Sequence, residues 1–215
     1  MPFPSDAIQS AVSEFWLARQ AGTQAARHDK AFLNLVGEEL GSLGWPAHVA
    51  QGFSDSQAVV AGHFRPAKAW DIVCRDSQGE PRICVEFKSQ VDSYGNNENN
   101  RYEEALGSGL DVRARYGGKA ALGFLLVICD EEATRRPTRD RLPDLDPAFR
   151  GNSHLDRRMI FAERIVEWEL EKRSLYDASA VLMVERDGGF KHPTNDDLWI
   201  TNFPGKLVKA AGVRK

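Results

Sequence analysis

The chain has 215 residues, of which 42% are hydrophobic and 27% charged, and its formal net charge is −3. These values are ordinary for a globular protein with one sizeable core, so we expect a single domain over residues 1–215. A negative net charge excludes a protein that coats nucleic acid with a uniformly basic surface. It is compatible with a DNA enzyme that has a local basic cleft.

The sequence shows no sign of a membrane span, a signal peptide or a disulfide. No apolar run approaches the length of a bilayer-spanning helix, and the opening Met1-Pro2-Phe3-Pro4 does not begin a signal peptide. The three cysteines, Cys74, Cys84 and Cys129, lie in apolar strand-like segments without metal-ligand spacing, so we expect buried thiols. Such thiols suit a reducing compartment, and the expected location is the cytoplasm, without membrane association.

Two helices are expected at the start of the chain. Apolar residues at helical spacing predict the first over residues 5–22, with Ser5 as its N-cap. The second is predicted over residues 29–43, and Glu39 lies within its apolar stripe whereas Glu38 points away. An acid in this position either projects into solvent from the edge of the stripe or faces a functional site, so Glu39 is a candidate catalytic residue. The predicted buried face consists of Phe32, Val36, Leu40 and Leu43.

The middle of the chain predicts a sheet with one crossover helix. Residues 57–64 are expected to form a first strand, and residues 70–74 and 83–90 are expected to form a hairpin. A helix over residues 98–116 follows, and the apolar run 122–129 then returns as a central strand parallel to the second hairpin strand. This order predicts an α/β fold with an αβββαβ core, in which helices flank a mixed central sheet.

Beyond this core, the sequence predicts a charged loop over residues 131–153, a helix over residues 154–177 and a strand over residues 181–184. Arginines in the loop are interleaved with prolines, and a phosphate-binding loop and a solvated loop are equally good interpretations. These arginines are Arg135, Arg136, Arg139 and Arg141.

The predicted hairpin, which we call the catalytic hairpin (residues 69–90), carries the main chemical signal. Gln78-Gly79 is typical of a two-residue turn, because glycine tolerates positive φ. Such a turn pairs Ser77 with Glu80 and places Asp71 opposite Glu86. Since side chains alternate along a strand, Glu86, Lys88 and Gln90 are expected on the face of Asp71, whereas Ile83, Val85 and Phe87 point to the other face.

Asp71 and Glu86 indicate a metal site. Carboxylates facing each other across a hairpin have Cβ atoms roughly 5 Å apart and repel each other. A hard cation such as Mg²⁺, which proteins hold with one or two carboxylates plus phosphate oxygens, offsets this repulsion. With Lys88 beside it, the pair suits phosphodiester hydrolysis, in which the ion polarises the phosphate and the lysine orients the attacking water. The alternative for Glu86 and Lys88 alone is an exposed strand face of mixed charge.

An asparagine-rich segment, residues 93–104, follows this hairpin, and we call it the DNA-reading segment. It contains Asn96, Asn97, Asn99 and Asn100 around Glu98, and then Arg101. Asparagine can bind the edge of adenine, arginine the edge of guanine, and a glutamate can accept a hydrogen bond from cytosine. The segment also begins a helix, where N–H groups favour phosphate. The alternative is a helix-capping loop, because asparagine favours turns and caps.

Together these blocks closely resemble the XhoI family of type II restriction endonucleases, within the PD-(D/E)xK nuclease superfamily. Three departures are visible: Trp70 stands where the superfamily has proline, Glu98 stands where an apolar or aromatic residue is expected, and the segment 22–30 is shorter than in relatives. The residues that carry the resemblance are Trp70-Asp71, Glu86-Phe87-Lys88-Ser89-Gln90-Val91, Gly95-Asn96-Asn97, Asn99-Asn100-Arg101 and Glu103-Glu104-Ala105.

The resemblance implies a restriction-endonuclease-like core and Mg²⁺-dependent cleavage of double-stranded DNA at a palindrome, expected to be CTCGAG. It implies a homodimer and a companion methyltransferase that acts on the same site without forming a stable complex. Asp71, Glu86 and Phe87 are expected to bind the metal, and Lys88 to act as the water-orienting base. Gln90 and the segment 96–101 are expected to bind DNA.

Two other functions fit the same residues. One is a different nuclease of this superfamily, acting in repair or in a mobile element. The other is a DNA-binding relative without catalysis, which the intact Asp71, Glu86 and Lys88 argue against.

Overall fold

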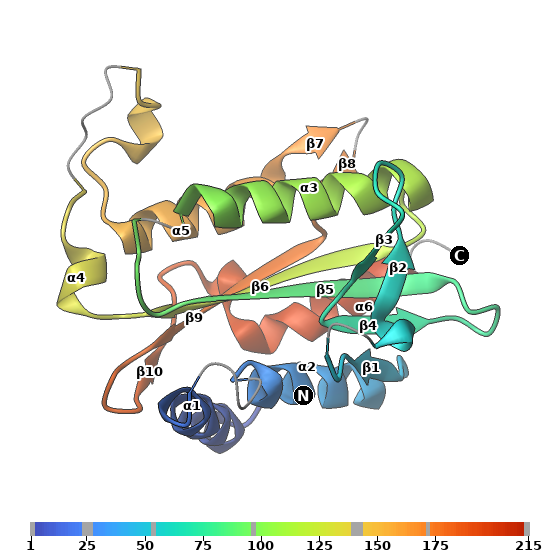
Figure 1. Ribbon diagram of the computed structural model, residues 1–215, viewed down its shortest axis with the longest axis horizontal. Helices are drawn as coiled ribbons and strands as arrows, with labels where there is room; N and C mark the ends of the chain where they lie inside the picture. Colours follow the sequence, from blue (N-terminus) through green and yellow to red (C-terminus); the bar gives the residue numbers. More distant parts are fainter. Residues whose placement is uncertain are drawn as a thin grey trace.

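A sheet of six strands in the order β1-β4-β5-β6-β9-β10 forms the centre of the structure, which is a computed structural model (Figure 1). It describes residues 3–22, 28–52, 55–95, 98–138, 144–170 and 173–212. The β5–β6 and β6–β9 pairs are parallel and the other three pairs are antiparallel, so the sheet is mixed. Its strands are β1 (Ala47–Val49), β4 (Ile72–Arg75), β5 (Pro81–Gln90), β6 (Ala121–Cys129), β9 (Ala178–Val184) and β10 (Phe190–Lys191).

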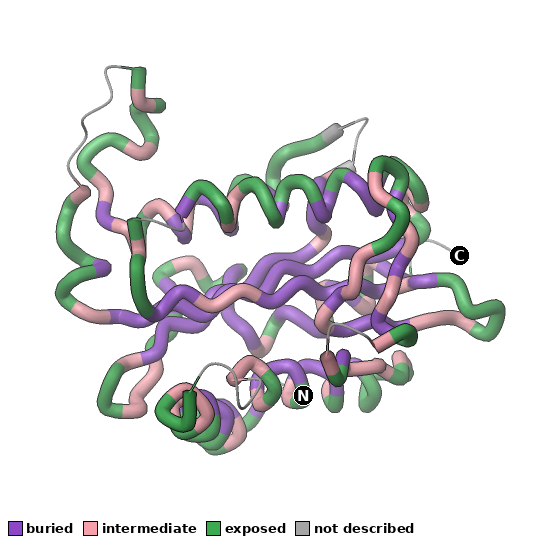
Figure 2. Tube along the Cα trace, viewed as in Figure 1, coloured by how far each residue is buried: buried purple, intermediate pink, exposed green. Residues whose placement is uncertain are grey.

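Helices cover both faces of this sheet (Figure 1). On one face pack α1 (Ser5–Gln20), α2 (Lys30–Ser42) and α6 (Phe203–Gly212). On the other face pack α3 (Glu98–Tyr116) and α5 (His154–Glu167), and the short α4 (Glu132–Arg135) follows β6. The central strands are buried between these two layers (Figure 2), as are the three cysteines, which are free thiols as expected. In the described part of the chain, no helix is long and apolar enough to cross a membrane.

The predicted fold class is confirmed, because helices flank a mixed sheet and the order α2-β1-β4-β5-α3-β6 reproduces the αβββαβ core. The prediction of its first strand is wrong. Residues 57–64 instead contain β2 (Val59–Ala61), which pairs with β3 (Ala67–Ala69) in a separate two-stranded sheet. The true first strand, β1, has only three residues, too few to show an alternating pattern in the sequence.

Several helix ends and one helix cap also differ from the predicted ones. The predicted helix over residues 154–177 ends at Glu167, because Trp168 adopts an extended conformation with ψ 126°. The chain then forms the short hairpin of β7 (Glu169–Leu170) and β8 (Arg173–Ser174) before it enters β9. Ser5 is not a cap but the first residue of α1, after Pro4. Leu43 lies just beyond α2 and is 38% exposed, so it is not part of the buried face.

Candidate functional site

The turn of the catalytic hairpin differs from the predicted one. The Asp76 N–H donates to the Glu80 carbonyl at 3.0 Å, so the loop has three residues, and Gly79 takes the left-handed conformation with φ +81°. The Asp76 carboxylate favours this turn, since it accepts N–H bonds from Gln78 at 2.9 Å and Glu80 at 3.0 Å. The predicted pairing of Ser77 with Glu80 is therefore wrong.

A β-bulge in β5 restores the predicted pairing register of β4 and β5, and this register determines where the site residues lie. Arg75 pairs with Pro81, but Cys74 pairs with Ile83, so Arg82 is an extra residue on β5. The longer loop shifts the pairing of the two strands in one direction and the bulge shifts it back, so the two effects cancel. The ladder then continues in the predicted register up to the last pair, Ile72 with Val85, immediately before Asp71 and Glu86.

The faces of β5 alternate as predicted. Ile83, Val85 and Phe87 pack in the core with α1, α2 and α6, whereas Cys84 packs in the core with α3 and α5. Glu86 follows on the α3 side and is only 1% exposed. A carboxylate buried to this degree needs cationic partners or a metal ion. The interpretation of an exposed strand face of mixed charge is therefore wrong for Glu86.

Two lysines neutralise the Glu86 carboxylate. Lys88 Nζ lies 2.6 Å from Oε1, and Lys68 Nζ contacts Oε2. Lys68 belongs to β3 and was not among the residues predicted from the sequence. Asp71 lies beside this cluster, and its Oδ2 accepts the Phe87 N–H at 2.7 Å. The structure therefore gathers three of the predicted residues, Asp71, Glu86 and Lys88, and adds Lys68.

The surroundings of Asp71 fit a divalent cation. Burial, and secondarily the charge of Glu86, raises the pKa of Asp71 to about 6. A bound cation would relieve this penalty, and carboxylate oxygens are ligands that Mg²⁺ accepts. The Phe87 N–H faces Asp71, and because N–H and C=O of one strand residue point to the same side, its carbonyl faces the same edge.

The described residues contain no cluster of three or more His, Cys, Asp or Glu side chains that would form a complete metal cage. Mg²⁺ does not require one, since it usually keeps several waters and takes phosphate oxygens beside one or two carboxylates. Asp71, Glu86 and the Phe87 carbonyl are therefore the groups that could supply protein oxygens to such an ion.

Asp71→Asn is expected to stabilise the metal-free protein at neutral pH. The pKa of Asp71 is raised from 3.8 to about 6 on folding, so its favourable contribution exists below pH 3.8 and is lost as the pH rises through about 6. In EDTA at pH 7.5 the variant should therefore melt at a higher temperature, by roughly 2–4 °C per kcal/mol gained. The difference should shrink at about pH 4.5, where the native carboxyl is protonated. An equal difference at both pH values would contradict this assignment.

Glu104 on α3 connects Lys88 to Arg101, and the sequence marked it only as part of the family resemblance, without a role in the site. Its Oε2 lies 3.3 Å from Lys88 Nζ and 2.9 Å from an Arg101 guanidinium nitrogen. One carboxylate oxygen thus joins a candidate base-reading residue to a candidate catalytic one.

The DNA-reading segment is described up to Gly95 and again from Glu98 onwards, while Asn96 and Asn97 lie outside the described residues. Asn99 and Asn100 are exposed in the first turn of α3, and the Arg101 side chain is 33% exposed, so these three are available to a ligand. Gln90 is buried, and its side-chain amide donates to the Tyr94 carbonyl at 2.7 Å. A DNA contact by Gln90 therefore stays a prediction.

Glu98 points into the protein. It is 8% exposed, its Oε1 accepts the Tyr102 hydroxyl at 3.0 Å, and its Oε2 lies 3.5 Å from His154 Nδ1 on α5. This burial explains why an apolar or aromatic side chain is expected at the position. In the free protein Glu98 thus joins α3 to α5.

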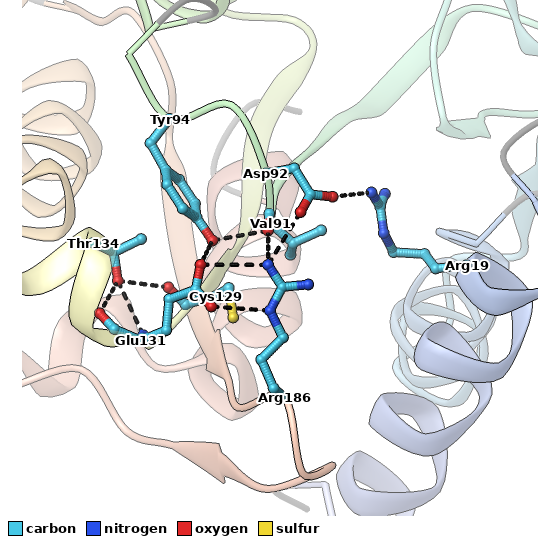
Figure 3. A network of polar contacts seen from close by, with 8 residues as sticks. All are labelled: Arg19, Val91, Asp92, Tyr94, Cys129, Glu131, Thr134 and Arg186. Carbon is cyan, nitrogen blue, oxygen red and sulfur yellow. Dashed lines mark hydrogen bonds and ion pairs between the residues drawn. The ribbon is translucent and has the colours of Figure 1, made fainter.

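A polar network fixes the start of the DNA-reading segment (Figure 3). The Tyr94 hydroxyl donates to Glu131 Oε1 at 2.6 Å, and Arg186 Nε donates to Glu131 Oε2 at 2.9 Å. Arg186 also bonds Asp92 at 3.0 Å, and Arg19 of α1 bonds the other oxygen of Asp92 at 2.7 Å. The end of β5 is thereby tied to α1, to the end of β6 and to the β9–β10 turn.

Two other predicted features lie apart from this cluster. Glu39 is on α2, which packs on the sheet face opposite to Glu86, so the structure does not bring it among the others and its role stays a prediction. Arg135 bonds Asp130 at 2.6 Å and Arg136 pairs with Glu132, which favours the solvated-loop interpretation for these arginines. Arg139 and Arg141 lie outside the described residues.

The model of the family described as restriction endonuclease XhoI matches residues 12–193. Type II restriction enzyme BstVI of Geobacillus stearothermophilus is 32% identical over 183 residues, which cover 77% of this chain and 79% of that protein. Type II restriction enzyme XhoI of Xanthomonas vasicola is 35% identical over 115 residues, covering 49% of this chain and 46% of that protein. No solved structure matches.

Proposed function

Because the chain belongs to the XhoI family of restriction endonucleases, we propose that it cleaves both strands of DNA at the palindrome CTCGAG by Mg²⁺-dependent phosphodiester hydrolysis. Its relatives are type II restriction enzymes, which are site-specific deoxyribonucleases and generally need a divalent metal ion. The observation that carries the proposal is the meeting of Asp71, Glu86 and Lys88 at one end of the catalytic hairpin, with Lys88 Nζ 2.6 Å from Glu86.

Each residue of this group has a distinct role in the proposed hydrolysis. The carboxylates of Asp71 and Glu86 and the carbonyl of Phe87 would hold the ion, which polarises the phosphate and lowers the pKa of a bound water. Burial alone would lower the pKa of Lys88, but Glu86 and its other acidic neighbours outweigh it and hold this pKa above its ordinary value. Lys88 would therefore act as an ammonium that orients the water and neutralises charge developing on the phosphate, and not as the base that the resemblance implied.

Base reading is assigned to the DNA-reading segment, since Asn99, Asn100 and Arg101 are accessible next to the catalytic cluster. One such segment reads a half-site of about three base pairs, and two copies related by a two-fold axis read a six-base palindrome. We therefore infer a homodimer on double-stranded DNA. A companion methyltransferase would protect the same site in the host without a stable complex.

The test is digestion of a plasmid of known sequence with Mg²⁺, followed by run-off sequencing of the ends. We expect both strands to be cut at every CTCGAG, and EDTA to prevent cutting. The matched control is the same plasmid with one base changed in each site, which should stay intact. Cuts at another fixed palindrome would overturn the site but not the enzyme class. Nicking or structure-specific cutting would indicate a repair or mobile-element nuclease, and DNA binding without cutting an inactive relative.

A further inference from the structure

Lys68 reaches the catalytic cluster from a neighbouring hairpin, that of β2 and β3. Its Nζ contacts Glu86 Oε2, lies 3.2 Å from the Ala69 carbonyl oxygen, and sits 4.7 Å from the centre of the Trp70 ring. Trp70 stands at the position where the superfamily has proline. It is 1% exposed, so packing holds its ring in place beside the Lys68 ammonium. With Lys88 on Oε1, both oxygens of Glu86 have a lysine partner.

This arrangement is electrically balanced without a metal ion. The formal charges of Asp71, Glu86, Lys68 and Lys88 sum to zero when both acids are ionised. A divalent cation held by both carboxylates would have to displace one of these two lysines from Glu86, and the charge of Lys68 acts more strongly on Asp71 than that of Lys88 does. The ion would also be repelled by the Lys68 ammonium, because like charges at short distance repel each other strongly in a partly buried site. The ion and Lys68 therefore compete for Glu86.

The backbone that carries Lys68 is fixed independently of this contact. On α3, Asp111 Oδ1 accepts the N–H groups of His63 at 2.7 Å and Phe64 at 2.6 Å, at the tip of the β2–β3 hairpin. Gly62 has no room for a side chain there, because a Cβ would lie 2.0 Å from Asp111 Oδ2. The flexible lysine side chain can therefore change partner while its hairpin stays in place.

We propose that Lys68 occupies the metal-binding oxygen of Glu86 in the metal-free protein and turns to the scissile phosphate of DNA when a divalent ion binds. Lys68 is then a phosphate-binding catalytic residue that competes with the ion in the absence of DNA. This proposal rests on the proposed function, because it takes Asp71 and Glu86 as the metal-binding residues.

The test measures ion binding and cleavage separately in Lys68→Met, a substitution that keeps an unbranched chain and removes the charge. Calorimetric titration with Ca²⁺ in the absence of DNA should give a dissociation constant at least about tenfold lower than that of the parent, because the competing charge is gone. Cleavage of CTCGAG plasmid at saturating Mg²⁺ should nevertheless be at least about tenfold slower, because the phosphate loses one cation. A residue that only supports the fold would not tighten ion binding.

Two variants serve as controls. Lys68→Arg keeps the positive charge and should bind Ca²⁺ as weakly as the parent does. Lys206→Met removes a lysine that lies on α6, on the opposite face of the sheet, and pairs with Asp197 at 2.8 Å, so both measurements should equal those of the parent. Lys68→Gln, also uncharged, repeats the test if Lys68→Met does not fold.

The outcomes separate this proposal from the proposed function. If the parent binds Ca²⁺ and cuts DNA but the uncharged variants bind the ion no more tightly, Lys68 does not compete and the proposal is overturned alone. Tighter ion binding with unchanged cleavage overturns the phosphate role. If the parent binds no divalent ion at all, the metal site of the proposed function fails and the proposal fails with it.

Discussion

Glu86→Gln is expected to lower the rate of DNA cleavage at saturating Mg²⁺ by at least about 100-fold, the cost of removing one preorganised electrostatic group. Glu86 is the centre of the cluster, since Lys88 lies 2.6 Å from one of its oxygens and Lys68 contacts the other. The amide keeps the size of the side chain but binds a divalent ion poorly. Alanine substitutions of Asp71 and Lys88 should have effects of the same order.

The fold of Glu86→Gln should survive. The side chains of Lys68 and Lys88 are 20% and 18% exposed, so each ammonium can reach solvent, and Lys88 keeps Glu104 as a partner. The measurement is the initial rate of plasmid cleavage, with circular dichroism to verify folding. Full activity in Glu86→Gln, or cleavage that resists EDTA, would disprove the assignment.

Two glutamates of α2, Glu38 and Glu39, are tested in the same cleavage assay. Glu38 is exposed, so Glu38→Gln is a matched control that should cut at the parent rate. Glu39→Gln tests the predicted catalytic role of Glu39. A large loss of rate would show that this residue acts on the site from the opposite side of the sheet, and an unchanged rate would remove it from the site.

Arg101→Ala is expected to lower the rate of CTCGAG cleavage strongly, while binding to unrelated DNA at low salt persists. One bidentate contact to a base contributes roughly 1–3 kcal/mol of discrimination, whereas non-specific affinity depends on phosphate contacts. Cleavage of CTCGAG should be compared with cleavage of single-base variants, and binding should be followed by fluorescence anisotropy with Ca²⁺ in place of Mg²⁺. Asn97→Ala should behave in the same way.

Arg101 also pairs with Glu104 at 2.9 Å, so its loss could act through that residue alone. Glu104→Gln removes this pair and leaves Arg101 free to read a base, and it should therefore retain discrimination between cognate and variant sites. If Arg101→Ala and Asn97→Ala both cut CTCGAG at the parent rate, the segment is only a helix cap and does not read DNA.

Local sequence patterns by themselves determined the catalytic hairpin, helix α3 and the parallel strand β6. Their signals arise between neighbouring residues: alternation places Glu86 and Lys88 on one face and Val85 and Phe87 on the other. The strand pairing at the open end of the hairpin was predicted correctly, although the turn itself was not. The extra loop residue and the bulge at Arg82 compensate each other, and the hydrophobic alternation on both strands tolerates only the register that results.

Only the tertiary structure decided which side chains complete the site. Lys68 reaches Glu86 because Asp111 fixes the β2–β3 hairpin to α3, and Glu104 meets Lys88 because α3 packs across β5. No pattern in the sequence encodes these contacts, since each joins elements whose separation is set by side-chain packing rather than by residue spacing. Strand β1 stayed hidden for a related reason: three residues carry too little periodicity, and their pairing with β4 defines them as a strand.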